Sequence, residues 1–252
     1  TGPVSVAATA TLKAKAFLSG MTASDTATAA YVITAKAGGL RMVNASNPTG
    51  GIGDGQFIYF GKDPYDANAP IKWRVLDADA NNSGESTGMF LLSEYALRPD
   101  ADNSTIVFAT SSSQWQLSNA QSWCTGSADA DSGYLTAAEL YAVPAVSKTD
   151  AAEEYGNLSL GASALSQEKV FFLSAGEVLD YIGAGNDGLA ATYRSGAAAS
   201  DWWLRTPTSA GDQVSIVLSD NKNLSYAPVY TTSCIRPALN IDAGKILFTS
   251  AA

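Results

Sequence analysis

The sequence predicts an α+β protein. Segments typical of β-strands occupy the beginning and the end of the chain, and helix-start signals lie between them. These segments do not alternate in regular strand–helix–strand units, which argues against a parallel sheet flanked by helices. The chain has 252 residues, of which 46% are hydrophobic, so it can bury one sizeable core together with a small additional module.

The N-terminal segment predicts a two-stranded β-ribbon. Residues 11–16 and 26–33 alternate small or polar residues with apolar ones, and a turn-forming stretch with a glycine separates them. We therefore assign residues 1–36 to a partial β domain. Residues 37–55 are rich in glycine and show no hydrophobic period, so they predict a linker. The main domain then extends over residues 56–252.

The main domain begins with strand-like segments and returns to them in its last third. These segments are rich in β-branched, aromatic and other apolar residues, and turn-forming residues bound them. The expected strands are residues 57–61, 71–76, 89–93, 201–205, 213–218, 233–241 and 245–248. We expect turns at residues 81–88 and 220–223.

Three helices are expected in the middle of the main domain. In residues 111–123, tryptophans recur at loosely helical spacing after a serine that can cap the helix. Thr136 with Glu139, and Ser174 with Glu177, match the capping box, in which two side chains satisfy the first backbone N–H groups of a helix. Capping explains both glutamates without a role as glycosidase acids. The second box follows the apolar run VFFL, which predicts a strand directly before the helix.

Three of the six arginines stand inside apolar runs. Arg74 lies in IKWRVL, Arg205 in WWLR and Arg236 in IRPAL. A guanidinium beside tryptophan, leucine and isoleucine must find carboxylates, carbonyls or aromatic faces that offset its desolvation. We therefore expect Arg205 and Arg236 to be buried, hydrogen-bonded structural residues.

Composition excludes several classes of function. The formal net charge of −9 repels phosphate backbones and anionic membranes, so we expect no nucleic-acid partner. No stretch approaches the roughly 20 apolar residues that span a bilayer, so we expect no membrane insertion. The chain contains no histidine, which removes the commonest general base and zinc ligand, and we expect no metal and no cofactor.

The two cysteines, Cys124 and Cys234, lie far apart in the sequence and fit no metal-ligand spacing. From the sequence alone, a disulfide between them and two separately buried thiols are both compatible with the pattern. The surplus of small and short polar residues over lysine suits an exported surface protein. In such a compartment disulfides persist, so a disulfide is the expectation for an extracellular chain.

The order of the main-domain motifs resembles a bacterial domain family of unassigned role, the DUF6273 family. The matching strings are IKWRVL, FLLS, VFFLS with Glu177, WWLR with Pro207, and IRPAL, and the resemblance covers about residues 55–250. The C-terminal order is also similar to the C-type lectin fold of formylglycine-generating-enzyme-like domains and of variable proteins diversified by retroelements. The resemblance implies a C-type-lectin-like scaffold that binds a ligand.

The N-terminal segment resembles one further family, and the motifs of two other families are missing from the chain. Residues 11–16 and 31–33 resemble the last strands of an immunoglobulin-like repeat found at the C-terminal end of chitobiase-like proteins. The chain lacks the Glu-Pro-Asn and Trp-Asn-Asp strings of calcium-dependent lectins. It also lacks the close C-terminal cysteine pair of formylglycine-generating enzymes, which argues against that chemistry.

The segment between WWLR and IRPAL supplies the candidate binding residues. Tyrosines give large contact areas at low entropic cost, and short polar residues give adaptable hydrogen bonds, as in antibody paratopes. The candidates are Asp201, Trp203, Asp212, Gln213, Asn221, Asn223, Tyr226, Tyr230 and Thr232. An ordinary polar surface loop is the alternative interpretation of the same residues.

We therefore expect a non-catalytic ligand-binding domain of a bacterial surface protein, such as a diversified receptor-binding or adhesin module. Its partner would be a protein or a glycan at a cell surface, and the domain would act as an extracellular monomer. Two alternatives remain open. The domain could be a structural spacer of a long surface protein, or it could be a carbohydrate-active or thiol-oxidising enzyme.

Overall fold

The computed structural model describes residues 10–14, 24, 27–31, 56–78, 88–209, 211–242 and 245. The chain divides into two compact units, one of Thr1–Leu40 with Thr249–Ala252 and the other of Arg41–Phe248. In the first unit, β1 (Ala10–Ala14) pairs antiparallel with β2 (Ala27–Tyr31), which confirms the predicted ribbon. The expected linker, residues 37–55, and all but Lys245 of the expected last strand lie outside the described residues.

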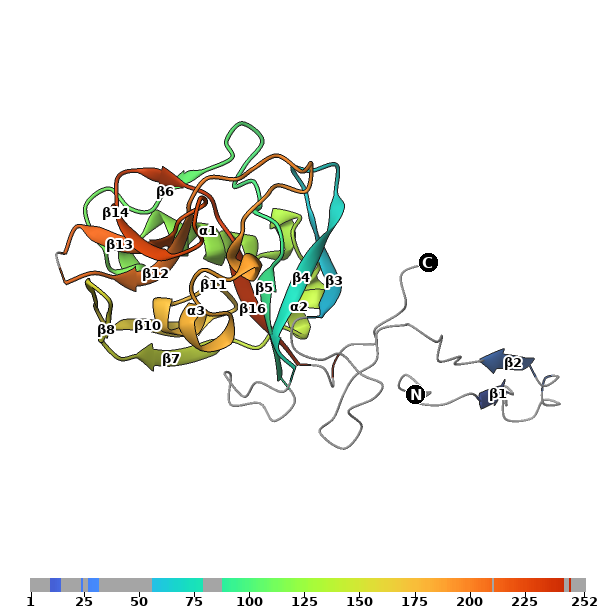
Figure 1. The fold of residues 1–252 in the computed structure, drawn as a ribbon. Coiled ribbons are helices and arrows are strands. Elements are labelled where there is room, and N and C mark those ends of the chain that lie inside the picture. Colours follow the sequence, from blue (N-terminus) through green and yellow to red (C-terminus); the bar gives the residue numbers. More distant parts are fainter. Residues whose placement is uncertain are drawn as a thin grey trace. The chain divides into compact units, whose positions relative to one another are not determined.

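An antiparallel sheet of five strands forms the centre of the second unit (Figure 1). Its strands follow the spatial order β11 (Val170–Phe172), β16 (Pro237–Asp242), β5 (Gly88–Ser93), β4 (Ala69–Asp77) and β3 (Phe57–Asp63). Every residue of the inner strands β5 and β16 is buried. The continuous apolar run of β5 fits a strand that is covered on both faces.

Smaller sheets surround this centre. A three-stranded antiparallel sheet has the order β12 (Trp202–Pro207), β13 (Gln213–Val217) and β14 (Leu224–Pro228). The two-stranded pairs are β6 (Ile106–Val107) with β15 (Thr232–Ser233), β7 (Val146–Asp150) with β10 (Ser163–Glu168), and β8 (Glu153–Tyr155) with β9 (Leu158–Leu160).

The α-helices are short: α1 (Asn119–Ser127), α2 (Ala137–Tyr141) and α3 (Ala175–Tyr181). Both predicted capping boxes are confirmed, at the starts of α2 and α3. The first helix is capped by Ser118, whose side chain accepts from the Gln121 N–H, and the preceding Trp115–Leu117 forms a separate 3-10 turn. This turn divides the segment that the tryptophan spacing predicted as one helix.

The described part of the chain is mainly β, so the predicted α+β class is wrong. The error has two physical causes. The capping signals are real, but each starts a helix of only five to nine residues. In addition, β7, β8 and β10 consist largely of polar residues, and β9 and β14 are short, so their strand conformation comes from antiparallel pairing, not from a long apolar alternation.

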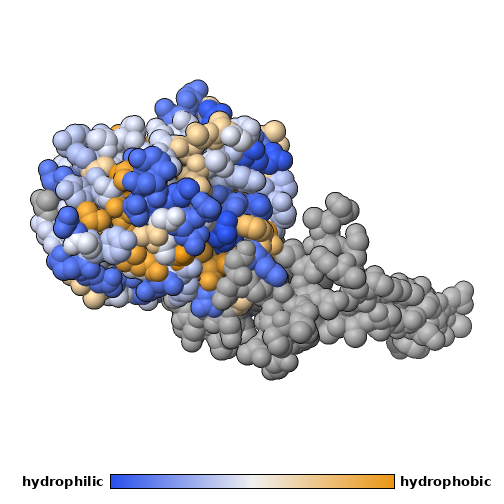
Figure 2. Space-filling view, viewed as in Figure 1, coloured by the Kyte–Doolittle hydropathy of each residue, from blue (hydrophilic) through white to orange (hydrophobic). Residues whose placement is uncertain are grey.

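Large aromatic side chains fill the core of the second unit. Trp73, Trp115, Trp202 and Trp203 are each at most 2% exposed. Both adjacent tryptophans of β12 are fully buried, because each face of the strand is covered and each indole N–H finds a backbone carbonyl. On the outside, Figure 2 shows hydrophobic residues in small patches among hydrophilic ones on the visible face. None of the helices in the described ranges has the length and apolarity of a membrane-spanning helix.

Candidate functional site

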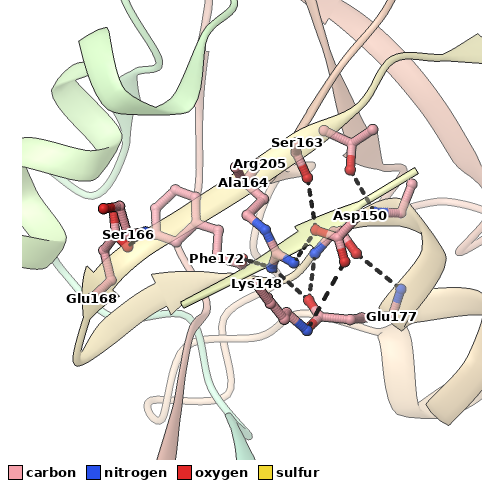
Figure 3. A network of polar contacts seen from close by, with 12 residues as sticks. Lys148, Asp150, Ser163, Ala164, Ser166, Glu168, Phe172, Glu177 and Arg205 are labelled. Atoms are coloured by element: carbon pink, nitrogen blue, oxygen red, sulfur yellow. Dashed lines mark hydrogen bonds and ion pairs between the residues drawn. The ribbon is translucent and has the colours of Figure 1, made fainter. Parts of the chain in front are cut away.

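Arg205 lies at the centre of a buried ion-pair network (Figure 3). The side chain is 0% exposed, as the sequence predicted. Its guanidinium donates to the Phe172 carbonyl at 2.6 Å, to Oε2 of Glu177 and to Oδ2 of Asp150. The network thereby joins three elements, because these acceptors belong to β11, α3 and β7.

Charges of opposite sign compensate one another in this Arg205 network. Lys148 pairs with the other carboxylate oxygen of Glu177. Burial, together with the nearby Arg205, lowers the pKa of Lys148 to about 8. Burial alone would raise the pKa of Asp150, but Arg205 and Lys148 outweigh it and hold that pKa below its usual value. Because these charged groups form ion pairs with one another, we assign the network a structural role.

Arg236 is the second buried arginine, and it is held without a carboxylate. It is 0% exposed and donates to the carbonyls of Ser93 at 3.0 Å and of Gly188 and Leu189 at 3.3 Å. Its guanidinium lies 4.9 Å from the centre of the Trp202 ring. Burial lowers the pKa of Arg236 to about 10. Both predicted structural arginines are thus confirmed, and Arg236 fastens two loops to the end of β5.

The expected disulfide between Cys124 and Cys234 is wrong, since both cysteines are buried free thiols. Cys124 lies in α1, and burial raises the pKa of its thiol well above the usual range. Cys234 lies between β15 and β16, where its sulfur is 2.9 Å from the Tyr193 hydroxyl and 3.2 Å from the Ser200 hydroxyl. Each thiol therefore packs in its own part of the core.

The structure divides the predicted binding residues between the two ends of the β13–β14 hairpin. At the turn end, Asn221 and Asn223 are exposed, and their turn is closed by a bond from the Asn223 N–H to the Asn221 side chain. Asp201 lies near this end, where its carboxylate accepts from the Ser219 N–H at 2.8 Å. These three residues help to shape the turn.

The other predicted residues lie along the hairpin and at its open end. Asp212 is exposed, Gln213 is half-buried and Thr232 is exposed in β15. Tyr226 is 46% exposed and Tyr230 is 64% exposed, so both tyrosines reach solvent, as a binding role requires. They belong to a surface that extends over the hairpin, and none of these residues lines the larger cavity described below.

Trp203 is a core residue, and its assignment as a ligand contact is wrong. It is 0% exposed, its indole N–H donates to the Ile106 carbonyl at 2.9 Å, and its ring packs against Phe108 with centroids 5.5 Å apart. The physical reason is that β6 and the following residues cover the face of β12 that would otherwise be open.

A different part of the second unit forms a cavity of about 270 Å³, which we call the tyrosine pocket. Three tyrosines, Tyr65, Tyr95 and Tyr193, line it from three separate loops. The charged residues in its wall are Asp63, Asp66, Lys72, Arg98 and Arg194. Ligand sites are concave and combine aromatic surface with a few polar groups, and this pocket has both features.

Backbone hydrogen bonds hold the walls of the tyrosine pocket in place. The Ala96 N–H donates to the Thr192 carbonyl at 2.9 Å, which joins the loop of Tyr95 to that of Tyr193. The Leu97 N–H donates to the Ile235 carbonyl at 3.1 Å. The Tyr193 hydroxyl donates to the Ser104 carbonyl at 2.8 Å, and its partial burial, together with its contact with the Cys234 sulfur, raises its pKa to about 12. The pocket is therefore preorganised.

The β3–β4 turn supplies the acidic side of the pocket. Asp63 is nearly buried and accepts from the Tyr65 N–H at 2.9 Å, and burial raises the pKa of its carboxyl. Asp66 lies 3.5 Å from Arg194 in a partly exposed ion pair. The negative charge of Asp66 adds to the rise in the pKa of Asp63. Both carboxylates of the pocket are engaged with protein groups.

Sequence reasoning missed this pocket. Its tyrosines stand in the polar, turn-rich strings KDPYDANAP, SEYALRPD and TYRSG, where an isolated aromatic residue gives no periodic signal. The strings come together only because the sheet order places β4 beside β5 and because residues 192 and 235 bond to the loop after β5. An aromatic residue in an otherwise polar turn was the one local sign of each tyrosine's role.

Comparison with known proteins gives one match. The model of a family described as "Domain of unknown function (DUF6273)" matches residues 86–243, which is more than half of the chain. No curated protein and no solved structure gives a match. The match includes the loops of Tyr95 and Tyr193, both buried arginines and the predicted hairpin surface.

Proposed function

The chain belongs to the DUF6273 family, and we propose that it is a non-catalytic ligand-binding domain whose binding site is the tyrosine pocket. The observation that supports this most directly is the convergence of Tyr65, Tyr95 and Tyr193 on one cavity. Tyrosine rings offer a flat apolar face and a polar edge, which suits a ligand that has both kinds of surface. A sugar ring has this character.

The size of the cavity limits what can enter it. A volume of about 270 Å³ lies just below the range of about 300–1,000 Å³ that is usual for small-molecule sites. One sugar unit of a longer glycan fits this scale, with the remainder of the chain outside the pocket. The cavity of about 210 Å³ beside the Arg205 network is a weaker candidate, because Lys148, Asp150 and Glu177 in its wall are already paired.

The enzyme alternatives find less support in the geometry. A glycosidase needs two carboxyl groups that are free to act on the scissile bond. In the tyrosine pocket, Asp63 accepts a backbone N–H and Asp66 pairs with Arg194. A thiol oxidase of the kind considered above needs two cysteines that meet, and Cys124 and Cys234 are buried separately. Binding without turnover is the function that these contacts favour.

The wider setting is also part of the proposal. The order of WWLR and IRPAL supports a likeness to the ligand-binding scaffolds of formylglycine-generating-enzyme-like domains and retroelement-diversified proteins, and the N-terminal ribbon supports an immunoglobulin-like repeat before it. We place the domain at the surface of a bacterial cell, where it would bind a glycan and act as an adhesin module. A spacer role is the competing proposal, and it requires no occupied pocket.

A glycan array followed by calorimetry tests the proposal with the complete chain. We expect saturable binding of at least one glycan, without turnover, and a loss of at least about tenfold in affinity for Tyr95→Ala, which removes pocket surface. The matched control is Tyr226→Ala with Tyr230→Ala, the same change on the exposed hairpin. If the control loses binding and Tyr95→Ala does not, the hairpin is the site and the pocket proposal is wrong. Absence of any bound glycan would favour the spacer.

A further inference from the structure

We propose that the sugar bound in the tyrosine pocket carries one negative charge, as a carboxylate or a sulfate ester. This inference rests on the proposed function and adds the chemical class of the ligand. It starts from Lys72 and Arg98, two cations in the pocket wall that have no carboxylate within 4.0 Å among the described residues.

Lys72 is held at the pocket by an aromatic ring. Its ammonium lies 3.8 Å from the centre of the Phe57 ring and 5.8 Å from that of Tyr95. Cation–π contacts orient an ammonium but leave its hydrogen-bond donors unused. An anion in the pocket would supply the missing acceptors, and it would do so beside the ring of Tyr95.

Arg98 has an unused donor in the same wall. One terminal nitrogen donates to the Ala101 carbonyl at 3.0 Å, whereas Nε is buried and has no hydrogen-bond partner among the described residues. Nε itself is closed off from the cavity, so an acidic group in the pocket would meet the guanidinium at a terminal nitrogen. A carboxylate or sulfate oxygen is a strong acceptor for a guanidinium.

The local charge balance has the sign that an anion requires. Lys72, Arg98 and Arg194 give three positive charges, and Asp63 and Asp66 give two negative ones, so the wall has a net charge of about +1 when all are ionised. The whole chain has a net charge of −9. A small positive pocket in an acidic protein acts at short range only, and one negative charge on the ligand neutralises it.

The tyrosines favour a sugar over an acidic peptide as the carrier of this charge. The Tyr193 hydroxyl is already engaged with Ser104 and Cys234, so the ring of this residue is the part left for a ligand. Tyr65 packs edge-on against Tyr134, with centroids 6.0 Å apart, which fixes its ring as well. Rings held in this way provide flat walls for a ring-shaped ligand.

The test compares acidic glycans with their neutral counterparts on the complete chain. An array should contain uronic-acid, sialic-acid, sulfated and neutral glycans, and each bound carboxylated glycan should also be offered after reduction of its carboxyl to an alcohol. We expect binding to acidic glycans and at least a tenfold loss on carboxyl reduction or desulfation, about 1.4 kcal/mol at 25 °C. The carboxylated and sulfated arms separate the two sources of charge.

Variants connect the charge preference to the pocket. Lys72→Met and Arg98→Gln should each weaken binding of the acidic glycan at least about tenfold, in line with a lost hydrogen bond to a charged group. Lys62→Met removes the same charge as Lys72→Met from an exposed position outside the pocket, so it should leave affinity unchanged. If Arg98→Gln does not fold, as judged by its thermal melt, Lys72→Met decides the point.

The outcomes separate this inference from the proposed function. If neutral glycans bind as tightly as acidic ones, or if Lys72→Met behaves like Lys62→Met, the domain still binds glycans but the charge assignment is wrong. If polyglutamate binds in the pocket and no glycan does, the sugar class is wrong. If no ligand binds, or if Tyr95→Ala has no effect on any ligand that does, both proposals are overturned.

Discussion

Replacing Arg205 by methionine tests whether the buried ion-pair network stabilises the fold. The substitution keeps an unbranched side chain of related length but removes the charge that faces Asp150 and Glu177. Removing one partner of a buried pair costs roughly 3–5 kcal/mol, because the other charge stays in a poorly solvated place. The Glu177 side chain is only 5% exposed, but Lys148 remains beside it and offsets part of the loss. We therefore expect a loss of about 3 kcal/mol.

Urea unfolding followed by tryptophan fluorescence measures this loss. Arg194→Met is the matched control, because that side chain is 53% exposed in a long ion pair, and its loss should cost less than about 0.5 kcal/mol. Combining Arg205→Met with Glu177→Gln, which removes the unpaired charge and keeps an oxygen for the capping box, should cost less than the sum of the two changes. A loss below about 0.5 kcal/mol for Arg205→Met, or strict additivity in the pair, would refute the reasoning.

Two further predictions concern pH and the hairpin surface. The unfolded chain binds the Lys148 proton up to its ordinary pKa of 10.5, whereas the folded chain releases it at about 8, so this group makes stability rise with pH between these values. Relative to Lys148→Met, the free energy of unfolding should rise by about 2 kcal/mol from about pH 7 to about pH 9.5, and parallel pH profiles would contradict the shift. Replacing Tyr226, Tyr230 and Asn221 together by alanine should change stability by less than about 0.5 kcal/mol per site, since all three are exposed. Unfolding of this triple variant would show that these side chains belong to the core.

Apolar patterning predicted the buried strands, because a strand that is covered on both faces needs apolar residues at successive positions. The strands β5 and β11 of the central sheet, and β12 of the three-stranded sheet, are buried along nearly their whole length, so their apolar runs fit only between two layers. The strand β4 instead alternates buried and partly exposed residues. The strand β7, with the sequence VSKTD, carries no such pattern. It is a strand because β10 pairs with it and because Lys148 and Asp150 enter the Arg205 network. Those partners are 13 to 55 residues away, beyond the reach of a local pattern.

The buried arginines show a second limit of sequence reasoning. An arginine within an apolar run predicts burial, since the neighbouring side chains leave it no route to water. The apolar run does not indicate which groups will bind the guanidinium. Arg205 pairs with two carboxylates, whereas Arg236 donates to three carbonyls and lies against the Trp202 ring. Only the tertiary contacts decide between these solutions, because they place β16 beside β5 and the Leu189 carbonyl at the Trp202 indole N–H.

The recognisable motifs and the tyrosine pocket are connected through the same contacts. Arg236 fastens the Ser93 and Gly188 carbonyls, and the chain reaches Tyr95 two residues after the first and Tyr193 five residues after the second. The Leu97 to Ile235 bond adds a third tie beside that arginine. The IRPAL string therefore positions both loops without lining the pocket. A motif of this kind identifies the structural framework. The contacts that we propose for a ligand lie in the turns that this framework brings together, where sequence pattern alone carries little information.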